Sequence, residues 1–257
     1  MFRARPEAGV IWVTGASSGI GRAVALELVK RGFRVAATAR RKAELYELVQ
    51  ASAGRIAAFP GDVTDREAMA AIVYEIEAAH GPITLAFLNA AVYFPVERDV
   101  FDADVVERTF AINIGGTANC LAPLLPCMKK RGYGQIAINA SLAGYAGLPD
   151  SMAYGSSKAA AIYMAEALKL TYQPEGLTIQ VVCPGFVRTP MTDQNDYAMP
   201  LLMDDHVAAR IICDGFLRAG FEITFPRRLA WSFKAARLLP YPLYFWLADR
   251  LTRRVRR

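Results

Sequence analysis

The fold class is indicated most directly by the sequence Val10-Ile11-Trp12-Val13-Thr14-Gly15-Ala16-Ser17-Ser18-Gly19-Ile20-Gly21. Its first four residues are apolar and predict a buried strand, and the glycine-rich residues 14–21 follow directly. An amphipathic segment comes next, with apolar residues close to helical spacing at Ile20, Ala23, Val24 and Val29. Gly32 ends that helix before a second apolar strand at 33–37. Strand, glycine turn, helix and strand together predict a βαβ unit.

The glycine turn has the properties of a dinucleotide site. Glycines let the backbone approach a pyrophosphate closely, and the start of the following helix offers unpaired N–H groups and a positive dipole end. We therefore expect cofactor contacts from Gly15, Ser17, Ser18, Gly19, Ile20 and Gly21. The spacing is Gly-x-x-x-Gly-x-Gly rather than the commoner GxGxxG. Taken alone, such a turn could equally be a plain connection between strand and helix.

A second motif indicates proton-coupled chemistry on an alcohol or carbonyl. Tyr154 and Lys158 are four residues apart, and a helix over 151–173 would place the phenol and the ammonium on one face. The cation would then favour the phenolate. Ser141 ends the apolar run 135–141, and its hydroxyl could hydrogen-bond a substrate oxygen while the tyrosine exchanges a proton with it. For this spacing alone, a tyrosine-lysine pair on a solvated helix face is the alternative.

Taken together, these motifs resemble the short-chain dehydrogenase/reductase family in order and spacing. The matching residues are 14–21, Asn89-Ala90-Ala91, Asn113, Ser141, Tyr154-x-x-x-Lys158 and Pro184-Gly185. The resemblance covers residues 9 to about 225. It implies a single-domain Rossmann fold that binds a nicotinamide cofactor and moves hydride to or from a carbonyl carbon.

The resemblance also implies roles for four residues. Tyr154 would be the general acid/base, and Ser141 would orient and polarise the substrate oxygen. Lys158 would hold the nicotinamide ribose and lower the pKa of the tyrosine. Asn113 would anchor a proton-relay water from a distorted point of its helix. The neighbouring pair Gly115-Gly116 permits such a distortion or, alternatively, close helix packing.

Further cofactor contacts carry over by position. The adenine would lie against Asp62 and Val63, and the nicotinamide carboxamide against Thr189. The other matching positions are Asn89, Ala90, Ala91, Pro184, Gly185 and Val187. Ala91 stands where the family usually has glycine, and adds a methyl group near the expected cofactor path.

The residues after the second strand bear on the choice of cofactor. NAD sites usually place an acid there for the ribose 2′-OH, whereas NADP sites need cations for a 2′-phosphate. This chain has Ala39 at the acid's place, followed by Arg40, Arg41 and Lys42. Guanidinium groups suit bidentate phosphate binding. We predict NADP(H), with Arg40 as the main discriminator and Arg41 in support. A solvated helix start is the alternative, although cations are poorly placed relative to a helix dipole there.

Length and composition agree with one α/β domain. The chain has 257 residues, of which 54% are hydrophobic, and strand patterns alternate with helical ones. We predict a doubly wound parallel sheet with helices on both faces over residues 1–225, and a basic, aromatic C-terminal tail over 226–257. The four cysteines show no CxxC spacing, so neither a metal site nor a disulfide framework is expected. Buried thiols and a first strand near residue 9 favour a cytoplasmic protein without a signal peptide.

The predicted tail concentrates the positive charge of the chain. Residues 226–257 hold nine lysines and arginines against Asp249 alone, a balance of +8, whereas the remaining residues sum to −2. The aromatic segment 238–248 contains two prolines and is too short to span a bilayer. The tail could pack on its own domain or a partner subunit, or rest peripherally on a membrane surface. Nucleic-acid binding is not expected, because no recognised binding fold accompanies these cations.

The expected substrate is a small hydrophobic ketone or aldehyde, or the matching secondary alcohol. The loop 191–203 would cover a pocket with mostly apolar, adaptable lining from Tyr93, Phe94, Leu148, Met152, Phe186, Tyr197 and Met199. The resemblance implies a homodimer through the two long helices before and within the catalytic motif. A non-catalytic dinucleotide-binding scaffold or sensor that associates through its tail is the alternative. The complete set of four catalytic residues argues against it.

Overall fold

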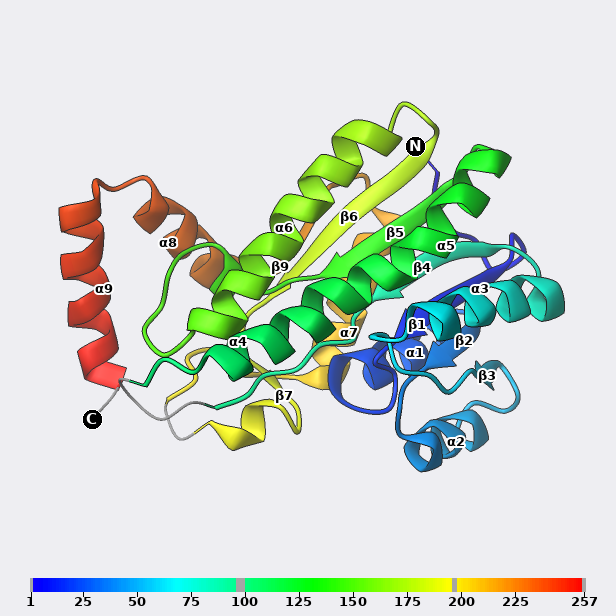
Figure 1. Ribbon diagram of the computed structural model, residues 1–257, viewed down its shortest axis with the longest axis horizontal. Coiled ribbons are helices and arrows are strands. Elements are labelled where there is room, and N and C mark those ends of the chain that lie inside the picture. The colour runs from blue at the N-terminus through cyan, green and yellow to red at the C-terminus, as the bar shows by residue number, and fades with distance from the viewer. Residues whose placement is uncertain (1, 96–99, 196–197, 256–257) are drawn as a thin grey trace.

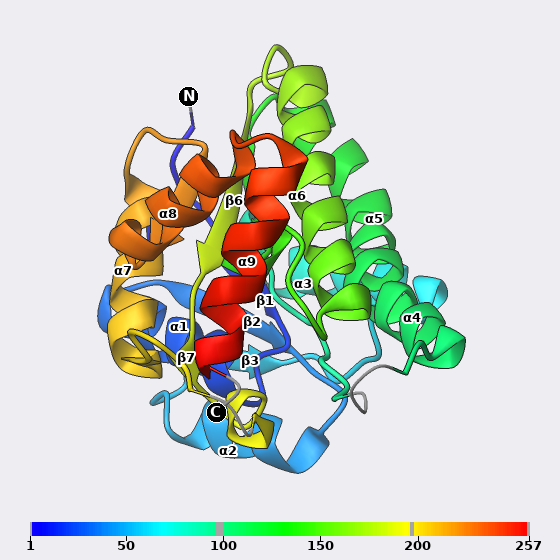
Figure 2. The same cartoon turned by 90° about the vertical axis from the view of Figure 1, so that its left-hand side faces the viewer.

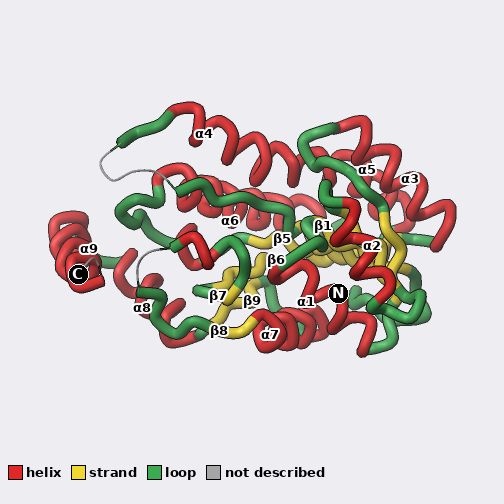
Figure 3. The backbone as a smooth tube through the Cα atoms, turned by 90° about the horizontal axis from the view of Figure 1, so that it is seen from below, coloured by secondary structure: helices red, strands yellow, loops and turns green. Residues whose placement is uncertain are grey.

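A single seven-stranded parallel sheet organises the protein. The computed structural model describes residues 2–95, 100–195 and 198–255, with side chains up to Arg250. The strands lie in the order β3-β2-β1-β4-β5-β6-β9, and every neighbouring pair is parallel. Helices cover both faces, with α3, α5 and α6 on one side and α1 and α7 on the other (Figure 3). The predicted doubly wound α/β fold is confirmed.

The βαβ unit predicted from the opening stretch lies beside the central strand of the sheet, β4. It consists of β1 (Val10–Thr14), α1 (Gly19–Lys30) and β2 (Arg34–Thr38). The second strand begins one residue later than predicted because the N–H of Phe33 donates to the Leu28 carbonyl and so belongs to the turn that closes α1. On its other side β1 pairs with β4 (Ile83–Leu88). The strand order therefore reverses between β1 and β4, which is where open α/β sheets bind ligands.

The remaining elements complete the two helical layers and the sheet edges. Asp65 accepts a hydrogen bond from the N–H of Ala68 and caps α3, as predicted. The strands are β3 (Ile56–Ala58), β5 (Gly134–Asn139), β6 (Leu177–Pro184) and β9 (Glu222–Phe225), with β7 (Val187–Arg188) and β8 (Met203–Asp204) forming a separate pair. The helices are α2 (Lys42–Gln50), α3 (Arg66–His80), α4 (Ala103–Phe110), α5 (Gly116–Arg131), α6 (Met152–Tyr172), α7 (Asp205–Leu217), α8 (Arg227–Arg237) and α9 (Tyr241–Val255).

The core is divided by the sheet into two layers. Ile11 and Val13 point to the α1 and α7 side, whereas Val10 and Trp12 point to the α3 and α5 side. This alternation follows from the two-residue period of a strand, with both faces buried because helices cover both. The polar end of Trp12 is satisfied by its indole N–H, which donates to the Thr38 hydroxyl at 2.9 Å.

One described helical run is long and apolar enough to cross a membrane by length and composition, Ala103–Arg131. It comprises α4, a five-residue π-helix at Ala111–Gly115 and α5. It packs on the sheet through buried side chains that include Leu121, Leu124 and Met128. The apolar residues of α5 therefore serve the core of this domain.

The predicted C-terminal tail forms two helices at one end of the molecule (Figures 1 and 2). Helix α8 belongs partly to the core, because Ala230 is buried and Leu229 and Phe233 pack against the same cluster as β5 and β6. Helix α9 stands further out and meets the domain through the buried Tyr244.

Candidate active site

The glycine turn between β1 and α1 is a tightly shaped cradle. Gly15 and Gly19 have φ angles of +66° and +53°, a region that glycine enters without steric cost. A Cβ on Gly21 would lie 2.3 Å from the Gly15 carbonyl oxygen and 2.5 Å from Nδ2 of Asn89. Ser18 precedes α1, but its side chain does not cap the first-turn N–H groups. The cradle therefore suits a pyrophosphate at the helix start, as predicted from the sequence.

The end of β4 holds this turn in place. The Thr14 hydroxyl accepts hydrogen bonds from the backbone N–H groups of Asn89 (2.9 Å) and Ala90 (3.1 Å). In return, the side-chain amide of Asn89 donates to the carbonyls of Thr14 and Gly15 at 3.1 and 3.3 Å. Asn89 and Ala90 thus support the cofactor cradle. Thr14 belongs to the matching stretch 14–21 but was not among the expected site residues, although it is the polar residue that ends the apolar strand.

Lys158 is joined to the same turn by a chain of hydrogen bonds. Its side chain on α6 is only 2% exposed, and Nζ donates to the Asn139 carbonyl at the end of β5, at 2.8 Å. The side-chain amide of Asn139 donates in turn to Oδ1 of Asn89, at 2.8 Å. Asn139 was not among the predicted site residues. Its signal in the sequence is a polar residue at the end of an apolar strand, two positions before Ser141.

Tyr154, Ser141 and Lys158 lie together, as the sequence predicts. The Lys158 Nζ is 5.5 Å from the centroid of the Tyr154 ring, one turn away on α6. The Tyr154 hydroxyl is hydrogen-bonded to Ser141. Tyr93 packs edge-on against the Tyr154 ring, with centroids 5.5 Å apart. The phenol and the serine hydroxyl can therefore meet one substrate oxygen, with an aromatic wall beside it.

The protonation of this pair differs from the expectation. Burial raises the pKa of Tyr154 to about 12, the hydrogen bond with Ser141 acts in the opposite direction, and the neighbouring Tyr93 adds to the rise. Burial also lowers the pKa of Lys158 to about 8. The expected lowering of the tyrosine pKa by Lys158 is not observed. The ammonium is engaged by the Asn139 carbonyl and faces the ring, so desolvation dominates.

Asn113 lies at a distorted point of its helix, as the family resemblance implied. Residues 111–115 form a π-helix, and the buried Asn113 side chain lies within it. Its Oδ1 accepts from the Val92 N–H at 2.8 Å, and Nδ2 donates to the Val92 carbonyl and to the Ser157 hydroxyl, at 3.1 and 3.0 Å. Ser157 donates to the Tyr154 carbonyl. Asn113 therefore ties the segment after β4 to the catalytic helix, while its role in a proton relay stays a prediction.

The pair Gly115-Gly116 also permits close packing, which was the alternative to a helix distortion. A Cβ on Gly116 would lie 2.5 Å from Cγ2 of Val63, so α5 approaches the segment after β3 closely. That segment includes Asp62, whose Oδ1 accepts from both the N–H and the hydroxyl of Thr64 at 2.9 Å. Asp62 is therefore held by Thr64, and Val63 packs against α5. Their contact with adenine stays a prediction.

The two arginines predicted to select the cofactor differ in their surroundings. Arg41 donates to the hydroxyls of Ser17 and Ser18 in the glycine turn, at 3.0 and 2.8 Å. Arg40 is more exposed and faces Asp62 at 3.7 Å. Arg41 also pairs with Glu44 at 3.1 Å. Arg41 therefore contacts the glycine turn, whereas Arg40, predicted as the main discriminator for the 2′-phosphate, faces Asp62.

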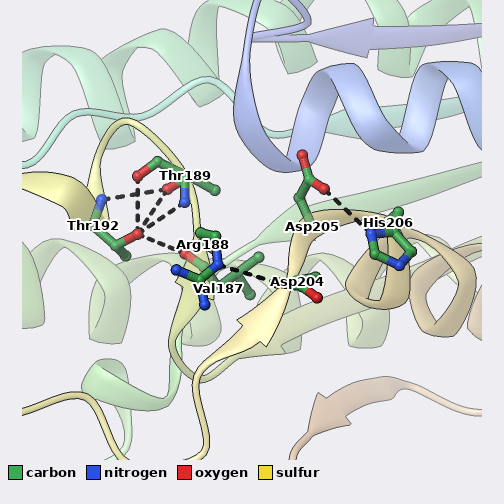
Figure 4. A network of polar contacts seen from close by, with 7 residues as sticks. All are labelled: Val187, Arg188, Thr189, Thr192, Asp204, Asp205 and His206. Atoms are coloured by element: carbon green, nitrogen blue, oxygen red, sulfur yellow. Dashed lines mark hydrogen bonds and ion pairs between the residues drawn. The ribbon is translucent and has the colours of Figure 1, made fainter.

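The loop after β6 lies against the glycine turn. A Cβ on Gly19 would lie 3.0 Å from Cγ2 of Thr189, so this threonine faces the glycine turn. Figure 4 shows how Thr189 is held: its N–H donates to the Thr192 hydroxyl at 2.9 Å, and that hydroxyl lies 2.8 Å from the Val187 carbonyl. At the end of β6, the Gly185 N–H donates to the Phe225 carbonyl, so Pro184 and Gly185 are fixed to β9.

The apolar residues expected to line the substrate pocket differ in their exposure and contacts. Tyr93 contacts Tyr154, and Leu148, Phe186 and Met199 are half-buried. Met152 is exposed at the start of α6. Phe94 is covered by the Arg108 guanidinium, 4.5 Å from the ring centroid, which is a cation that sequence reasoning did not connect with this region. Tyr197 lies outside the described residues.

Comparisons with known proteins agree with this geometry. The short chain dehydrogenase family model matches residues 9–199. An uncharacterized oxidoreductase from Myxococcus xanthus is 35% identical over 242 residues, which cover 93% of this chain and 96% of that protein. A short-chain dehydrogenase from Sphingobium yanoikuyae in complex with NADPH has a TM-score of 0.77 at 25% identity, covering 88% of this chain and 91% of that one.

A short-chain dehydrogenase/reductase from Burkholderia phymatum in complex with NAD has a TM-score of 0.82 at 21% identity, covering 91% of this chain and 94% of that one. This likeness supports the fold. The chain belongs to the short-chain dehydrogenase/reductase family. It is an NAD(P)-dependent oxidoreductase of the dehydrogenase/reductase type.

The buried ammonium predicts a specific pH dependence of stability. The pKa of Lys158 falls from 10.5 to about 8 on folding. Between these pH values the unfolded chain holds a proton that the folded chain has released, so the free energy of unfolding rises with pH. The full difference is about 3 kcal/mol. Urea titrations at several pH values from about 8 to 10.5 give this free energy. Over that range, the free energy of unfolding of the wild type should rise relative to that of Lys158→Met by up to this amount. An equal pH dependence of the two proteins would contradict the burial of this ammonium.

Proposed function

We propose that this protein is an NADP(H)-dependent oxidoreductase that transfers hydride between nicotinamide and a hydrophobic ketone or aldehyde, or the corresponding secondary alcohol. The observation that carries the proposal is the convergence of Tyr154, Ser141 and Lys158 beside the glycine turn, with Lys158 and the turn linked through Asn139 and Asn89. The glycine cradle and the uncapped start of α1 fit a dinucleotide pyrophosphate.

The residues present account for the proton that accompanies hydride transfer. The bound nicotinamide supplies or accepts the hydride at the substrate carbon. Ser141 hydrogen-bonds the substrate oxygen and orients it. Tyr154 keeps its proton near neutral pH because burial raises its pKa, and donates it to the oxygen as a carbonyl is reduced to an alcohol. Lys158, with a pKa of about 8, is positioned to stabilise the resulting phenolate until solvent restores the proton.

Replacing Tyr154 tests this assignment. Tyr154→Phe keeps the ring and its contact with Tyr93 but removes the proton, so kcat should fall by about 10²–10⁴-fold while NADPH binding is retained. Turnover is followed as loss of NADPH absorbance with a panel of lipophilic carbonyls, and binding by calorimetry. Tyr163→Phe, on the exposed side of the same helix, is the matched control and should leave the rate unchanged. A wild type that binds NADPH but turns over no carbonyl would favour the non-catalytic scaffold instead.

The preference for NADP(H) is supported by cations at the ribose end of the cradle. Arg41 bonds both serines of the glycine turn, and Arg40 stands beside it over Asp62. No acidic residue occupies position 39, where Ala39 is buried. A 2′-phosphate between the two guanidinium groups would accept charge-assisted hydrogen bonds, which a 2′-hydroxyl cannot match.

Two charge reversals test this preference and rank the arginines. Arg40→Asp and Arg41→Asp should each lower kcat/KM with NADPH relative to NADH by about 10- to 100-fold, the effect of losing a hydrogen bond to a charged group. Because Arg41 already contacts the turn, its replacement should have the larger effect. Arg34→Asp, an exposed arginine at the start of β2, is the control. An unchanged cofactor ratio in both variants would remove the arginines from this role.

The proposed substrate class follows from the side chains around the two hydroxyls. Tyr93 lies against the catalytic tyrosine, and Leu148, Phe186 and Met199 are half-buried apolar residues in the segments expected to line the pocket. Apolar walls with two convergent hydroxyls favour a ligand with one polar oxygen on a hydrophobic body. These apolar side chains indicate a class of substrate and do not specify a particular compound.

We also propose a homodimer through the outer face of α6 together with α5. Tyr163 and Leu170 are about three-quarters exposed on α6, and a shallow apolar hollow runs along this helix between Ala160 and Tyr172. The hollow is lined by uncharged side chains, so two copies can meet across it without opposing like charges. An exposed apolar patch of this kind is typical of an interaction site.

A charge placed in that hollow tests the dimer. Tyr163→Asp should convert a dimer to a monomer in light scattering, because a carboxylate would be buried without a partner. Tyr74→Asp is the control, since Tyr74 is equally exposed, at 76% against 75%, but lies on α3. A wild type that is monomeric, or a dimer that survives Tyr163→Asp, would contradict this interface.

A further inference from the structure

The outer side of the C-terminal helices exposes an unusual concentration of large apolar side chains. We call this surface the C-terminal face; it is formed by Trp231, Leu238, Tyr241, Leu243, Phe245 and Trp246. Leu238 is 87% exposed and Trp246 is 57% exposed. Tyr241 and Phe245 stack with ring centroids 5.6 Å apart, yet both remain open to solvent. Several large apolar side chains exposed on one pair of helices are typical of an interaction site.

The rest of α9 explains why these side chains point outward. Tyr244 is buried, and its hydroxyl donates to the Gly147 carbonyl in the loop between Ser141 and Tyr154. Because Tyr244 faces the domain, its neighbours Leu243, Phe245 and Trp246 are left exposed. Figure 2 shows α9 across the front of the molecule at the end away from the sheet centre. The helix is thus anchored on one side and presents the C-terminal face on the other.

Positive charge surrounds this face. Arg227, Arg228, Arg237 and Arg250 are exposed on α8 and α9, and the Arg250 guanidinium lies 5.6 Å from the Trp246 ring centroid. Residues 226–257 carry a net +8, whereas the rest of the chain carries −2. The last four arginines contribute to that sum, although their side chains lie outside the described residues. Aromatic and aliphatic groups are therefore combined with cations on one surface.

We propose that the C-terminal face docks on an anionic lipid surface, with α9 lying in the plane of the interface. Tryptophan and tyrosine rings favour the headgroup region, leucine and phenylalanine enter the acyl boundary, and arginines pair with lipid phosphates. The 15 residues of α9 are about 22 Å long, too short to cross a hydrocarbon core of about 30 Å. Helix α9 would therefore lie at the membrane surface.

Charge distinguishes a lipid surface from a second copy of the chain. In a two-fold symmetric dimer the same patch meets itself, so the exposed Arg227, Arg228, Arg237 and Arg250 would face cations of the second copy. The opposite pairing, tail against domain, would meet a body with a charge of only −2. An anionic bilayer instead presents negative headgroups to the whole face, and its acyl region can accommodate the side chains of Leu238 and Leu243.

Docking would bring the substrate side of the domain close to the lipid. The Tyr244 contact joins α9 to the loop at Gly147, and Lys234 on α8 pairs with Glu222, whose carboxylate also accepts from the Tyr145 hydroxyl. Both helices therefore touch the segment between Ser141 and Tyr154. A hydrophobic substrate held in the bilayer could reach the site from there. This last consequence rests on the proposed function, whereas docking itself does not.

Vesicle co-sedimentation of the full-length chain tests the proposal. The protein should bind vesicles of phosphatidylcholine with phosphatidylglycerol, bind pure phosphatidylcholine much more weakly, and dissociate as salt is raised. Each arginine near the surface contributes about fivefold, so Arg228→Glu/Arg250→Glu should weaken binding by at least about 25-fold. Trp246→Ser should weaken it several-fold. Circular dichroism checks that each variant is folded.

The matched controls are Arg5→Glu and Tyr74→Ser, which change an exposed arginine near the N-terminus and an exposed tyrosine on α3. Both should bind vesicles like the wild type. The proposal is overturned if the wild type does not bind anionic vesicles, or if the double arginine variant binds them undiminished. It is also overturned if Trp246→Ser only dissociates an oligomer, or if the face binds single-stranded DNA but not vesicles. Loss of NADPH turnover in Tyr154→Phe bears on the proposed function alone.

Discussion

The hydrogen bond from the buried Lys158 ammonium to the Asn139 carbonyl is the interaction on which the candidate site depends. Burying an ammonium is costly unless its protons have partners, and this carbonyl provides one. The side-chain amide of Asn139 donates a hydrogen bond to Asn89, and the side-chain amide of Asn89 donates to the Gly15 carbonyl in the glycine turn. The residue that would hold the ribose and the backbone that would hold the pyrophosphate are therefore parts of one hydrogen-bonded unit.

The parallel sheet explains why these groups meet. The strands β1, β4, β5 and β6 end at or just before Thr14, Asn89, Asn139 and Pro184, respectively. Because these strands are parallel, the four residues lie together along the carboxyl ends of the strands. A polar side chain at a strand end lies outside the apolar core, while the backbone hydrogen bonds of the adjoining strand still fix its position. The catalytic helix α6 brings Tyr154 and Lys158 over that edge, and Ser157 attaches it to Asn113.

Local patterns in the sequence predicted the elements, while tertiary contacts set the details. The first βαβ unit, the Asp65 cap and the catalytic helix follow from short-range spacing and were confirmed within a residue or so. The Asn89–Asn139 bond could not be predicted, because it depends on the register that pairs Leu88 with Ile138. The raised pKa of Tyr154 depends on burial, which its spacing to Lys158 does not specify. The two helices of the tail were not predicted from the sequence. Pro240 lies between α8 and α9, and Pro242 is the second residue of α9, where a proline is tolerated because it stands in the first turn of the helix.

The coupling of Lys158 to the cofactor cradle can be measured with a double-mutant cycle on NADPH binding. Calorimetric Kd values for the wild type, Asn89→Ala, Lys158→Met and the double variant give the interaction energy directly. If the two residues act as one unit, the double variant should lose less affinity than the sum of the single losses, by about 1 kcal/mol or more. Losses that add to within about 0.3 kcal/mol would show that the cradle and the lysine are independent, and would contradict the account.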